Sequence, residues 1–465
     1  MISIKSITML IVSMALFMDV LDSNIINTAV PAMSHTFHVS PIDIKIALIS
    51  YLLSLSIFIP ISGWAADKYG VKNIFMSAIG LFTLTSFFCG YAHSLVVLVI
   101  ARFIQGIGGA FMISLGRLII ARSFKRHELV DAMNTVIIVV SIAVMVGPFV
   151  GGVIVDHLSW PWIFWVNIPV GLFLMIISAN YLKDTSIKNP RPFDLLGFIL
   201  FGGSLALFCF SLSEMSESHN DLSATLLKMG VALLMLLAYV IHAKRKKHPV
   251  IKIDLFRIRT FRISVFGNLC ARLGFGGMPF LLPLLQQVGL GFSAQLSGLL
   301  MVPIAFGIIF AKLMAIKILR KMGYKKYLFI NSFFVGIILW TFQIINSHTS
   351  MIVIATLTFI FGIFISAQYT AMNSLALAEI KDEELSASTS ITSTVQILAQ
   401  SLGVAVGAIL LRFYSSLSQS KMTLTPTIFH DTFFTLGILT FMSAAIFLGL
   451  KKGDGVQMLV RKDVS

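Results

Sequence analysis

The sequence is poor in charge. Only 12% of its 465 residues are Asp, Glu, Lys or Arg, whereas an ordinary soluble domain carries about a quarter. Hydrophobic residues make up 57% of the chain, and the mean hydropathy is +0.92. A water-soluble globular protein of two or three domains is therefore excluded, and the composition is that of an integral membrane protein.

Features of enzymes and metal proteins are also scarce. The three cysteines, Cys89, Cys209 and Cys270, lie in apolar runs and form no CxxC or Cys/His spacing, so we interpret them as core residues. No GxxxxGK(S/T) phosphate loop is present, so ATP hydrolysis is not indicated. The ten histidines and the few carboxylates form no convincing catalytic or metal cluster. We therefore expect no enzyme, no metal and no cofactor.

The chain does contain long apolar runs, each of about 20 residues, the length that crosses a bilayer as a helix. Only helices satisfy their own backbone over such lengths in lipid. The fold class is therefore predicted to be an all-α polytopic membrane protein. We expect fourteen spans, at residues 7–31, 44–64, 73–92, 95–120, 132–156, 161–182, 195–214, 222–243, 261–287, 296–317, 327–347, 351–375, 387–413 and 429–449.

The net charge of +15 would point to nucleic acid in a soluble protein, but its distribution here gives the topology instead. Four Lys and Arg fall within predicted spans, namely Arg102, Arg117, Arg272 and Lys312, and four fall in loops on one side, namely Lys45, Lys228, Arg412 and Lys421. All the others fall on the opposite side, which the positive-inside rule makes the cytoplasm. We expect a multi-pass protein of the bacterial cytoplasmic membrane with both termini cytoplasmic and no nucleic-acid partner.

The order of the spans predicts two bundles with an inserted pair. Residues 1–190 would form an N-terminal six-helix bundle, and 191–243 two inserted transmembrane helices. Residues 244–262 would be a basic cytoplasmic linker, and 263–465 a C-terminal six-helix bundle with a short cytoplasmic tail. The linker is predicted from its density of Lys and Arg, which is typical of a solvated stretch facing anionic lipid.

Polar residues inside the first and fourth spans are the clearest functional signal. The first contains FMDVLDSNIINTAVP, with Asp19 and Asp22 three residues apart, and the fourth carries Arg102 followed by Gln105. Charges inside a membrane are costly, so they should face a polar interior and find partners. Asp19 and Asp22 are the nearest acidic candidates for Arg102. Asp22 could also be a packing carboxylate satisfied by Asn27 or by another helix.

Two further motifs indicate conformational parts. The loop GWAADKYGVK joins the second and third spans, and it could latch the cytoplasmic side through its carboxylate and its tight glycine turn. The latch candidates are Gly63, Asp67, Lys68, Gly70 and Lys72. In the fifth span a proline within a set of glycines predicts a kink and close helix packing. These residues are Gly147, Pro148, Gly151 and Gly152.

Taken together, these motifs resemble the major facilitator superfamily and, within it, the fourteen-helix drug:proton antiporters, including transporters of the multidrug resistance protein D type. The loop acid Asp67 matches the superfamily motif between helices two and three, and Arg102 opens the helix-four motif linked to proton coupling. The residues from Gly147 match the helix-five motif of exporters. LDSNIINTAVP resembles the first-helix signature of this branch, with Asp22 on its acid. The resemblance implies the major facilitator fold.

The expected function is a proton-coupled secondary active exporter of drugs or other amphiphilic small molecules, working by alternating access. Proton coupling is assigned to Asp22, Asp19 and Arg102. Polar residues of both halves are candidates for the substrate cavity: Asn27, Gln105, Asn268, Arg272, Gln368, Tyr369 and Asn373. The expected partners are the substrate, protons and the lipid bilayer, and a periplasmic adaptor is possible but not indicated.

Two alternatives remain open at this point. The first is proton-coupled export of one endogenous organic anion or metal chelate, with Arg102 or Arg272 contacting its carboxylate. The second is a membrane receptor or scaffold that moves nothing across the membrane.

Overall fold

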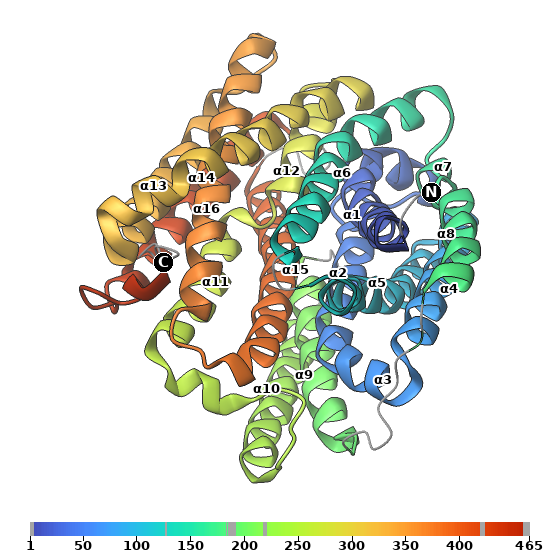
Figure 1. Cartoon of the computed structure of the whole chain (residues 1–465). Coiled ribbons are helices and arrows are strands. Elements are labelled where there is room, and N and C mark those ends of the chain that lie inside the picture. The colour runs from blue at the N-terminus through green and yellow to red at the C-terminus, as the bar shows by residue number, and fades with distance from the viewer. Residues whose placement is uncertain are drawn as a thin grey trace.

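The computed structural model describes residues 4–125, 128–182, 184, 192–216, 221–418 and 424–458. Every regular element within these ranges is a helix (Figure 1). Thirteen helical segments of the described chain are long and apolar enough to cross a membrane. The all-α membrane class predicted from the sequence is therefore confirmed.

The N-terminal bundle contains the first six crossings. Pro60 interrupts the second, where a short 3-10 turn, Ile59–Ile61, separates α2 from α3. The helices are α1 (Ile4–Phe37), α2 (Lys45–Phe58), α3 (Ser62–Tyr69), α4 (Val71–Gly90), α5 (Leu95–Ser123), α6 (Leu129–His157), the single turn α7 (Trp162–Trp165) and α8 (Asn167–Tyr181).

An inserted helical pair follows, α9 (Leu195–Glu214) and α10 (Leu222–Arg245). Asp194 caps α9 by accepting from the Gly197 backbone N–H at 3.2 Å, and it also lies 2.7 Å from Nε2 of His242 on α10. α9 packs against α2 and α15, while α10 leaves most of its leucines exposed, as expected for a surface in contact with lipid.

The C-terminal bundle begins after a short 3-10 segment, Ile253–Arg257. Its ninth crossing is broken at Gly276 and Gly277 and ends in one π-helical turn. Its elements are α11 (Arg259–Phe275), α12 (Met278–Leu284), the turn Leu285–Gly289, α13 (Ala294–Thr341), α14 (Met351–Leu377), α15 (Leu385–Leu417) and α16 (Pro426–Phe447).

The helix labelled α13 contains two crossings. Its 48 residues are two helices joined across a kink, and together they are more than twice the roughly 20 residues that one crossing needs. Gly323 interrupts it with φ 71° and ψ 161°, and the basic residues from Lys317 to Lys326 surround this break. The tenth and eleventh predicted spans meet here, so the architecture has about fourteen crossings.

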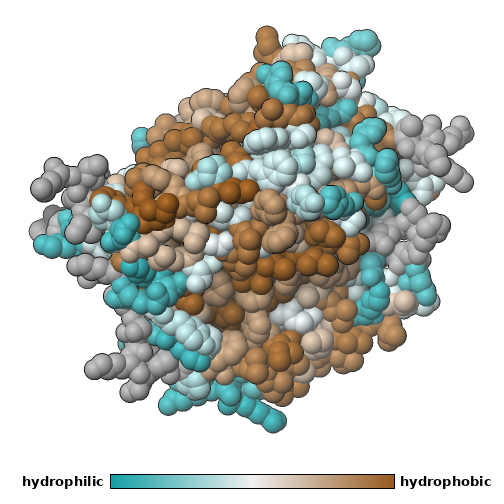
Figure 2. Space-filling view, turned by 90° about the vertical axis from the view of Figure 1, so that its right-hand side faces the viewer, coloured by the Kyte–Doolittle hydropathy of each residue, from teal (hydrophilic) through white to brown (hydrophobic). Residues whose placement is uncertain are grey.

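The two bundles lie side by side, with the C-terminal bundle at the left of Figure 1, the N-terminal bundle at the right, and α9 and α10 between them at the bottom. Figure 2 shows apolar side chains spread over the middle of one face, with polar residues mainly at its left and right margins. We call the side where α6 ends and α13 begins the distal side. The opposite side, which carries the turn at Gly70 and the linker before α11, is the basic side.

Candidate functional site

The central feature of the N-terminal bundle is a buried ion pair between Asp22 on α1 and Arg102 on α5. Both residues have 0% relative exposure, and Arg102 Nη1 donates to Asp22 Oδ2. The same nitrogen lies 2.7 Å from Gln105 Oε1, and Gln105 Nε2 donates to Asp22 Oδ1 at 3.2 Å. The ion pair predicted between an aspartate of the first span and Arg102 of the fourth is therefore present. Gln105, one turn beyond Arg102, forms hydrogen bonds with both of its members.

Polar and aromatic neighbours support this pair. Asn167, at the start of α8, donates to Asp22 Oδ1 at 2.8 Å, and Ser86 of α4 accepts from Gln105 at 2.9 Å. The Arg102 guanidinium carbon lies 4.1 Å from the centre of the Tyr51 ring and 5.5 Å from that of Phe164. A buried ion pair is tolerated only when such contacts offset its lost hydration.

Asp19 has a different environment, although it is also buried, at 2% exposure. It accepts a hydrogen bond from the Tyr51 hydroxyl at 2.5 Å, and no ion pair with Arg102 is formed. A Cβ added at Gly109 would lie 2.5 Å from Asp19 Oδ1, so this glycine provides the space for the carboxylate. Gly109 therefore serves the close packing of α5 against α1 and α2.

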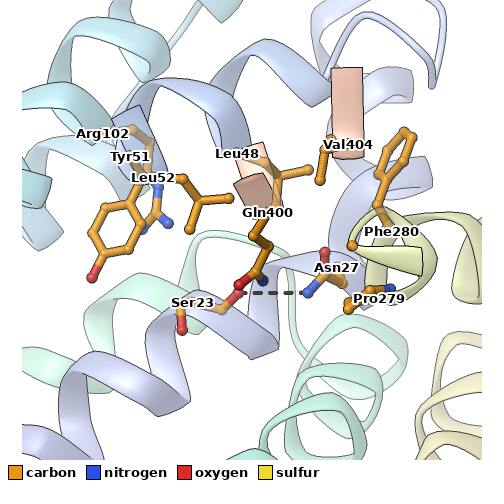
Figure 3. A pocket seen from close by; sticks show the side chains of 11 residues that line it. Ser23, Asn27, Leu48, Tyr51, Leu52, Arg102, Pro279, Phe280, Gln400 and Val404 are labelled. Atoms are coloured by element: carbon orange, nitrogen blue, oxygen red, sulfur yellow. Dashed lines mark hydrogen bonds between the residues drawn. The ribbon is translucent and has the colours of Figure 1, made fainter. Parts of the chain in front are cut away.

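A small pocket between the two bundles borders the ion pair (Figure 3). Arg102 and Tyr51 stand at one end of it and Phe280 and Pro279 at the other, while Gln400 reaches toward α1. Asn27 lines it too, but its amide donates to the backbone oxygens of Ser23 and Asn24, not to Asp22. The pocket is lined by Ser23, Asn27, Leu48, Tyr51, Leu52, Arg102, Gly276, Pro279, Phe280, Gln400 and Val404.

In the C-terminal bundle Arg272 forms a second buried cationic group. It is 7% exposed, its Nε donates to Asn268 Oδ1 at 2.8 Å, and its guanidinium carbon lies 3.9 Å from the centre of the Tyr369 ring. Within the described chain it forms no ion pair with a carboxylate. Three of the predicted cavity residues thus meet in one cluster.

The two remaining cavity candidates, both on α14, lie apart from the pocket. Gln368 is fully buried inside the C-terminal bundle, where it accepts from Asn331 at 2.7 Å and donates to Ser332 at 2.9 Å. Asn373 is exposed nearer the basic side and accepts from Gln396 of α15. Of these two candidates, one therefore lies in a packed interior and the other on an accessible surface.

The glycines of α6 serve close packing on two sides. Gly147 and Gly151 face α1, where added Cβ atoms would lie 3.0 Å from Asn24 Cβ and 2.6 Å from the Ile25 carbonyl oxygen. Gly152 faces α13, and a Cβ there would collide with the Ala294 carbonyl. A Cβ added at Gly298 of α13 would collide with the carbonyl oxygen of Pro148. This motif therefore brings the two bundles together at the distal side.

The predicted latch lies at the basic side. Asp67 Oδ1 is 3.5 Å from Arg122 Nη2, at the end of α5, and Gly70 has the φ of 90° that only glycine adopts freely. Lys68 sits over the rings of Trp64 and Tyr69, and Lys72 donates to the Ala179 carbonyl at 2.6 Å. A Cβ at Gly63 would meet no heavy atom of the described chain within 4 Å, so close helix packing does not require a glycine at this position.

Comparison with protein families settles the class of the molecule. The model described as Major Facilitator Superfamily matches residues 12–408. The chain belongs to this superfamily. The major facilitator fold and the membership read from the motifs are confirmed, and membership indicates a multi-pass transporter rather than an enzyme.

Similar superfamily members have names that agree with transport. The chain is 34% identical to the "Probable transport protein HsrA" of Haemophilus influenzae over 445 residues, 96% of each chain. It is 33% identical to the "Putative multidrug resistance protein MdtD" of Escherichia coli O157:H7 over 438 residues, 94% of this chain and 93% of that one. The predicted closeness to transporters of the multidrug resistance protein D type is thus confirmed.

Solved structures of other major facilitator proteins share the fold. A D-xylose-proton symporter gives a TM-score of 0.67 at 13% identity, covering 96% of this chain and 97% of its own. A bacterial homologue of the human lysosomal transporter Spinster, in an inward-facing conformation, gives 0.66 at 14% identity, with 97% of each chain covered. At such identities the likeness extends to the fold alone.

Several residues of the site were not predicted from the sequence. Asn167 follows the aromatic cluster WPWIFWV and is one of the few polar residues of its span, which could have marked it as a partner for a buried charge. Tyr51, by contrast, lies in an unremarkable apolar run. Only the packing of α2 against α5 in the major facilitator fold brings its ring to Arg102 and its hydroxyl to Asp19.

Proposed function

We propose that this protein is a proton-coupled secondary active exporter of small amphiphilic molecules. The observation that carries the proposal is the buried Asp22–Arg102 pair on the wall of a pocket between the two bundles. A carboxylate is the simplest group that can bind and release one proton in such a place. Its position lets the protonation state act on helices that move relative to each other in alternating access.

Protonation of Asp22 changes what this site can bind. The ionised carboxylate is an acceptor only and satisfies donors from Arg102, Gln105 and Asn167 together. Adding a proton removes the opposing charge from the buried Arg102 and converts one acceptor into a donor. The pair is thereby weakened, and the contacts that α1 makes with α5 and α8 change with it.

The conformation described here is proposed to face the cytoplasm. Contacts between the bundles gather at the distal side, where α6 packs on α13 and Gln287 donates to the Thr28 carbonyl at 3.1 Å. On the basic side one long hydrogen bond joins the bundles, from Arg117 of α5 to Ser393 of α15 at 3.4 Å, and the Arg117 side chain is nevertheless exposed, so we propose that this side is the more open one. The positive-inside rule assigns the basic side to the cytoplasm of a bacterial inner membrane, and we propose that both termini lie on that side.

Export by antiport is supported by the α6 motif and by the names of the relatives. A proton crossing about 100 mV inward releases roughly 2.3 kcal/mol, which can bias the cycle with no cofactor. Asp22, with Asp19 in support, would take a proton from the distal side and release it at the basic side while substrate moves out. No periplasmic adaptor is required by this scheme.

Reconstituted vesicles provide the test. Wild-type protein with an imposed pH gradient should show substrate-dependent proton movement and uphill flux of a panel of amphiphiles, and Asp22→Asn should lose the proton dependence. Asp431→Asn is the matched control, because it removes an exposed carboxylate at the distal end of α16. Unchanged proton-driven flux in Asp22→Asn would refute the assignment, and the absence of any flux in wild type would favour a receptor or scaffold.

A further inference from the structure

The two buried arginines of this protein differ in how their charges are compensated. Arg102 pairs with Asp22, whereas Arg272 is nine-tenths buried and forms no ion pair within the described chain. Burying an unpaired charge is costly, because neither the cation–ring contact nor a neutral amide cancels a full positive charge. The protein therefore maintains an uncompensated cation in its C-terminal bundle, at the level where the ninth crossing breaks.

The immediate contacts of Arg272 leave its binding edge free. Nε is used by Asn268, and the Tyr369 ring fixes the plane of the guanidinium at 3.9 Å. Among the residues that the structure describes, none forms a hydrogen bond with Nη1 or Nη2, and 7% of Arg272 remains accessible. A guanidinium held in this way presents two parallel N–H donors, the geometry that binds a carboxylate, phosphate or sulfonate oxygen pair.

Arg272 is also well placed relative to the pocket. Gly276, which lines the pocket, directly follows α11, and its backbone N–H donates to the Arg272 carbonyl at 2.6 Å. The pocket beyond it is mostly apolar, with Leu48, Leu52 and Phe280 among its walls. Arg117, exposed between the bundles, adds a second cation toward the basic side, and a positive, partly enclosed space concentrates anions.

We propose that Arg272 is the binding site for the acidic group of the substrate, so that the exported molecules are amphiphilic organic anions. The apolar part would lie in the pocket between Leu48 and Phe280, and the acidic group would take both free donors of Arg272. This inference rests on the proposed function for the transport step, but the binding site itself does not require transport. The alternative function considered from the sequence, export of an organic anion, thereby gains a specific binding residue.

Binding to the purified full-length protein tests the site directly. Equilibrium dialysis would compare 2-naphthoate with 2-naphthamide, which has the same rings and no charge. Wild type should bind the acid at least about tenfold more tightly, the usual scale of a charge-assisted contact. Arg272→Gln should abolish this difference in affinity. Arg272→Lys should retain part of it, because lysine keeps the positive charge but lacks the two parallel N–H donors of the guanidinium.

Lys312→Gln is the matched control, because Lys312 is a cation in a span of the same bundle whose side chain is exposed on α13. It should leave the preference for the acid unchanged. Equal or undetectable binding of the two compounds by wild type would overturn the proposal without any variant. Retention of the preference by folded Arg272→Gln, verified by its melting temperature and gel-filtration profile, would overturn it as well.

Flux measurements separate this inference from the proposed function. If naphthoate binds through Arg272 but no vesicle flux depends on the pH gradient, the site stands and the antiporter proposal fails. If vesicles show proton-driven flux of cationic and neutral naphthyl compounds, with no preference for the acid and no effect of Arg272→Gln, the antiporter stands and the anion site is refuted.

Discussion

Asp156, near the end of α6, accepts hydrogen bonds from the backbone N–H groups of Ala294 and Gln295 at the start of α13, at 3.2 and 2.7 Å. It therefore caps a helix of the other bundle, satisfying donors that have no partner within their own helix. His157 adds a contact with the Gln295 side chain at 3.2 Å. The distal contact between the bundles thus has a polar lock beside the packed glycines.

Removing this cap should favour opening at the distal side. A lost capping carboxylate costs about 1 kcal/mol, which corresponds to about a fivefold shift between two conformations. A cysteine introduced at Ser23, in the pocket, should react faster with a membrane-impermeant reagent added from the distal side when Asp156→Ala is present. Asp156→Asn should react at the wild-type rate, because asparagine caps nearly as well. Equal rates in all three proteins would contradict a gating role.

Larger side chains at the α6–α13 contact should also favour opening at the distal side, and more strongly than the loss of the Asp156 cap. A Cβ at Gly298 would collide with the Pro148 carbonyl, and one at Gly152 with that of Ala294, and overpacking typically costs 1–3 kcal/mol. Gly152→Val should therefore reduce transport severalfold while the protein still inserts in the membrane. Gly230→Val on α10 is the control, because a Cβ there meets nothing within 4 Å. Normal transport by Gly152→Val would show that distal closure is not required.

The two aspartates of α1 should differ in their effects on coupling. Asp22 accepts hydrogen bonds from three side chains, those of Arg102, Gln105 and Asn167. Within the described chain, Asp19 accepts one side-chain hydrogen bond, from Tyr51. Asp19→Asn should keep proton-dependent flux at a reduced rate, and Tyr51→Phe should reduce the rate similarly, since each removes one hydrogen bond worth about 1 kcal/mol. Proton uptake per substrate in vesicles measures this. Complete uncoupling by Asp19→Asn would make it the primary proton site instead.

The Asp67–Arg122 contact should matter more for transport than for stability. Its side chains are 38% and 36% exposed, and such surface pairs contribute at most about 1 kcal/mol. Asp67→Asn should leave the melting temperature nearly unchanged but slow transport if the loop acts as a latch. Arg122→Gln should produce the same slowing, and the double variant should be no slower than either single one. Additive slowing would mean that the two residues act separately.

Much of the fold was predictable because its main determinants are local. The length and the apolar character of the runs predicted the crossings. The connection between the tenth and eleventh spans is shorter than the predicted basic loop, because helical structure continues from both sides up to a kink at Gly323. A charged segment can still be helical when only one residue has to leave the helix.

The site was predicted less completely, since its partners come from distant parts of the chain. The cost of burying Arg102 was enough to predict a nearby aspartate, and the fold brings Asp22 to it. The cost of burying a charge does not determine which amide or aromatic side chain packs around the Asp22–Arg102 pair. Asn167 and Tyr51 were therefore not predicted. Gln368 looked equivalent to Tyr369 in sequence, but adjacent helical positions point in different directions, and it faces the bundle interior.

The inserted pair makes the molecule asymmetric with respect to lipid. Two lateral seams run between the bundles, one along α6 and α13 and the other along α2 and α15, and α9 packs over the second. Ile57 of α2 meets Gly202 of α9 there, 2.9 Å from the position of an added Cβ. A solute that partitions into the bilayer therefore finds the α2–α15 seam shielded by protein. The seam of α6 and α13 has no such covering helix among the element contacts of the described chain, so the two sides of the molecule meet the bilayer differently.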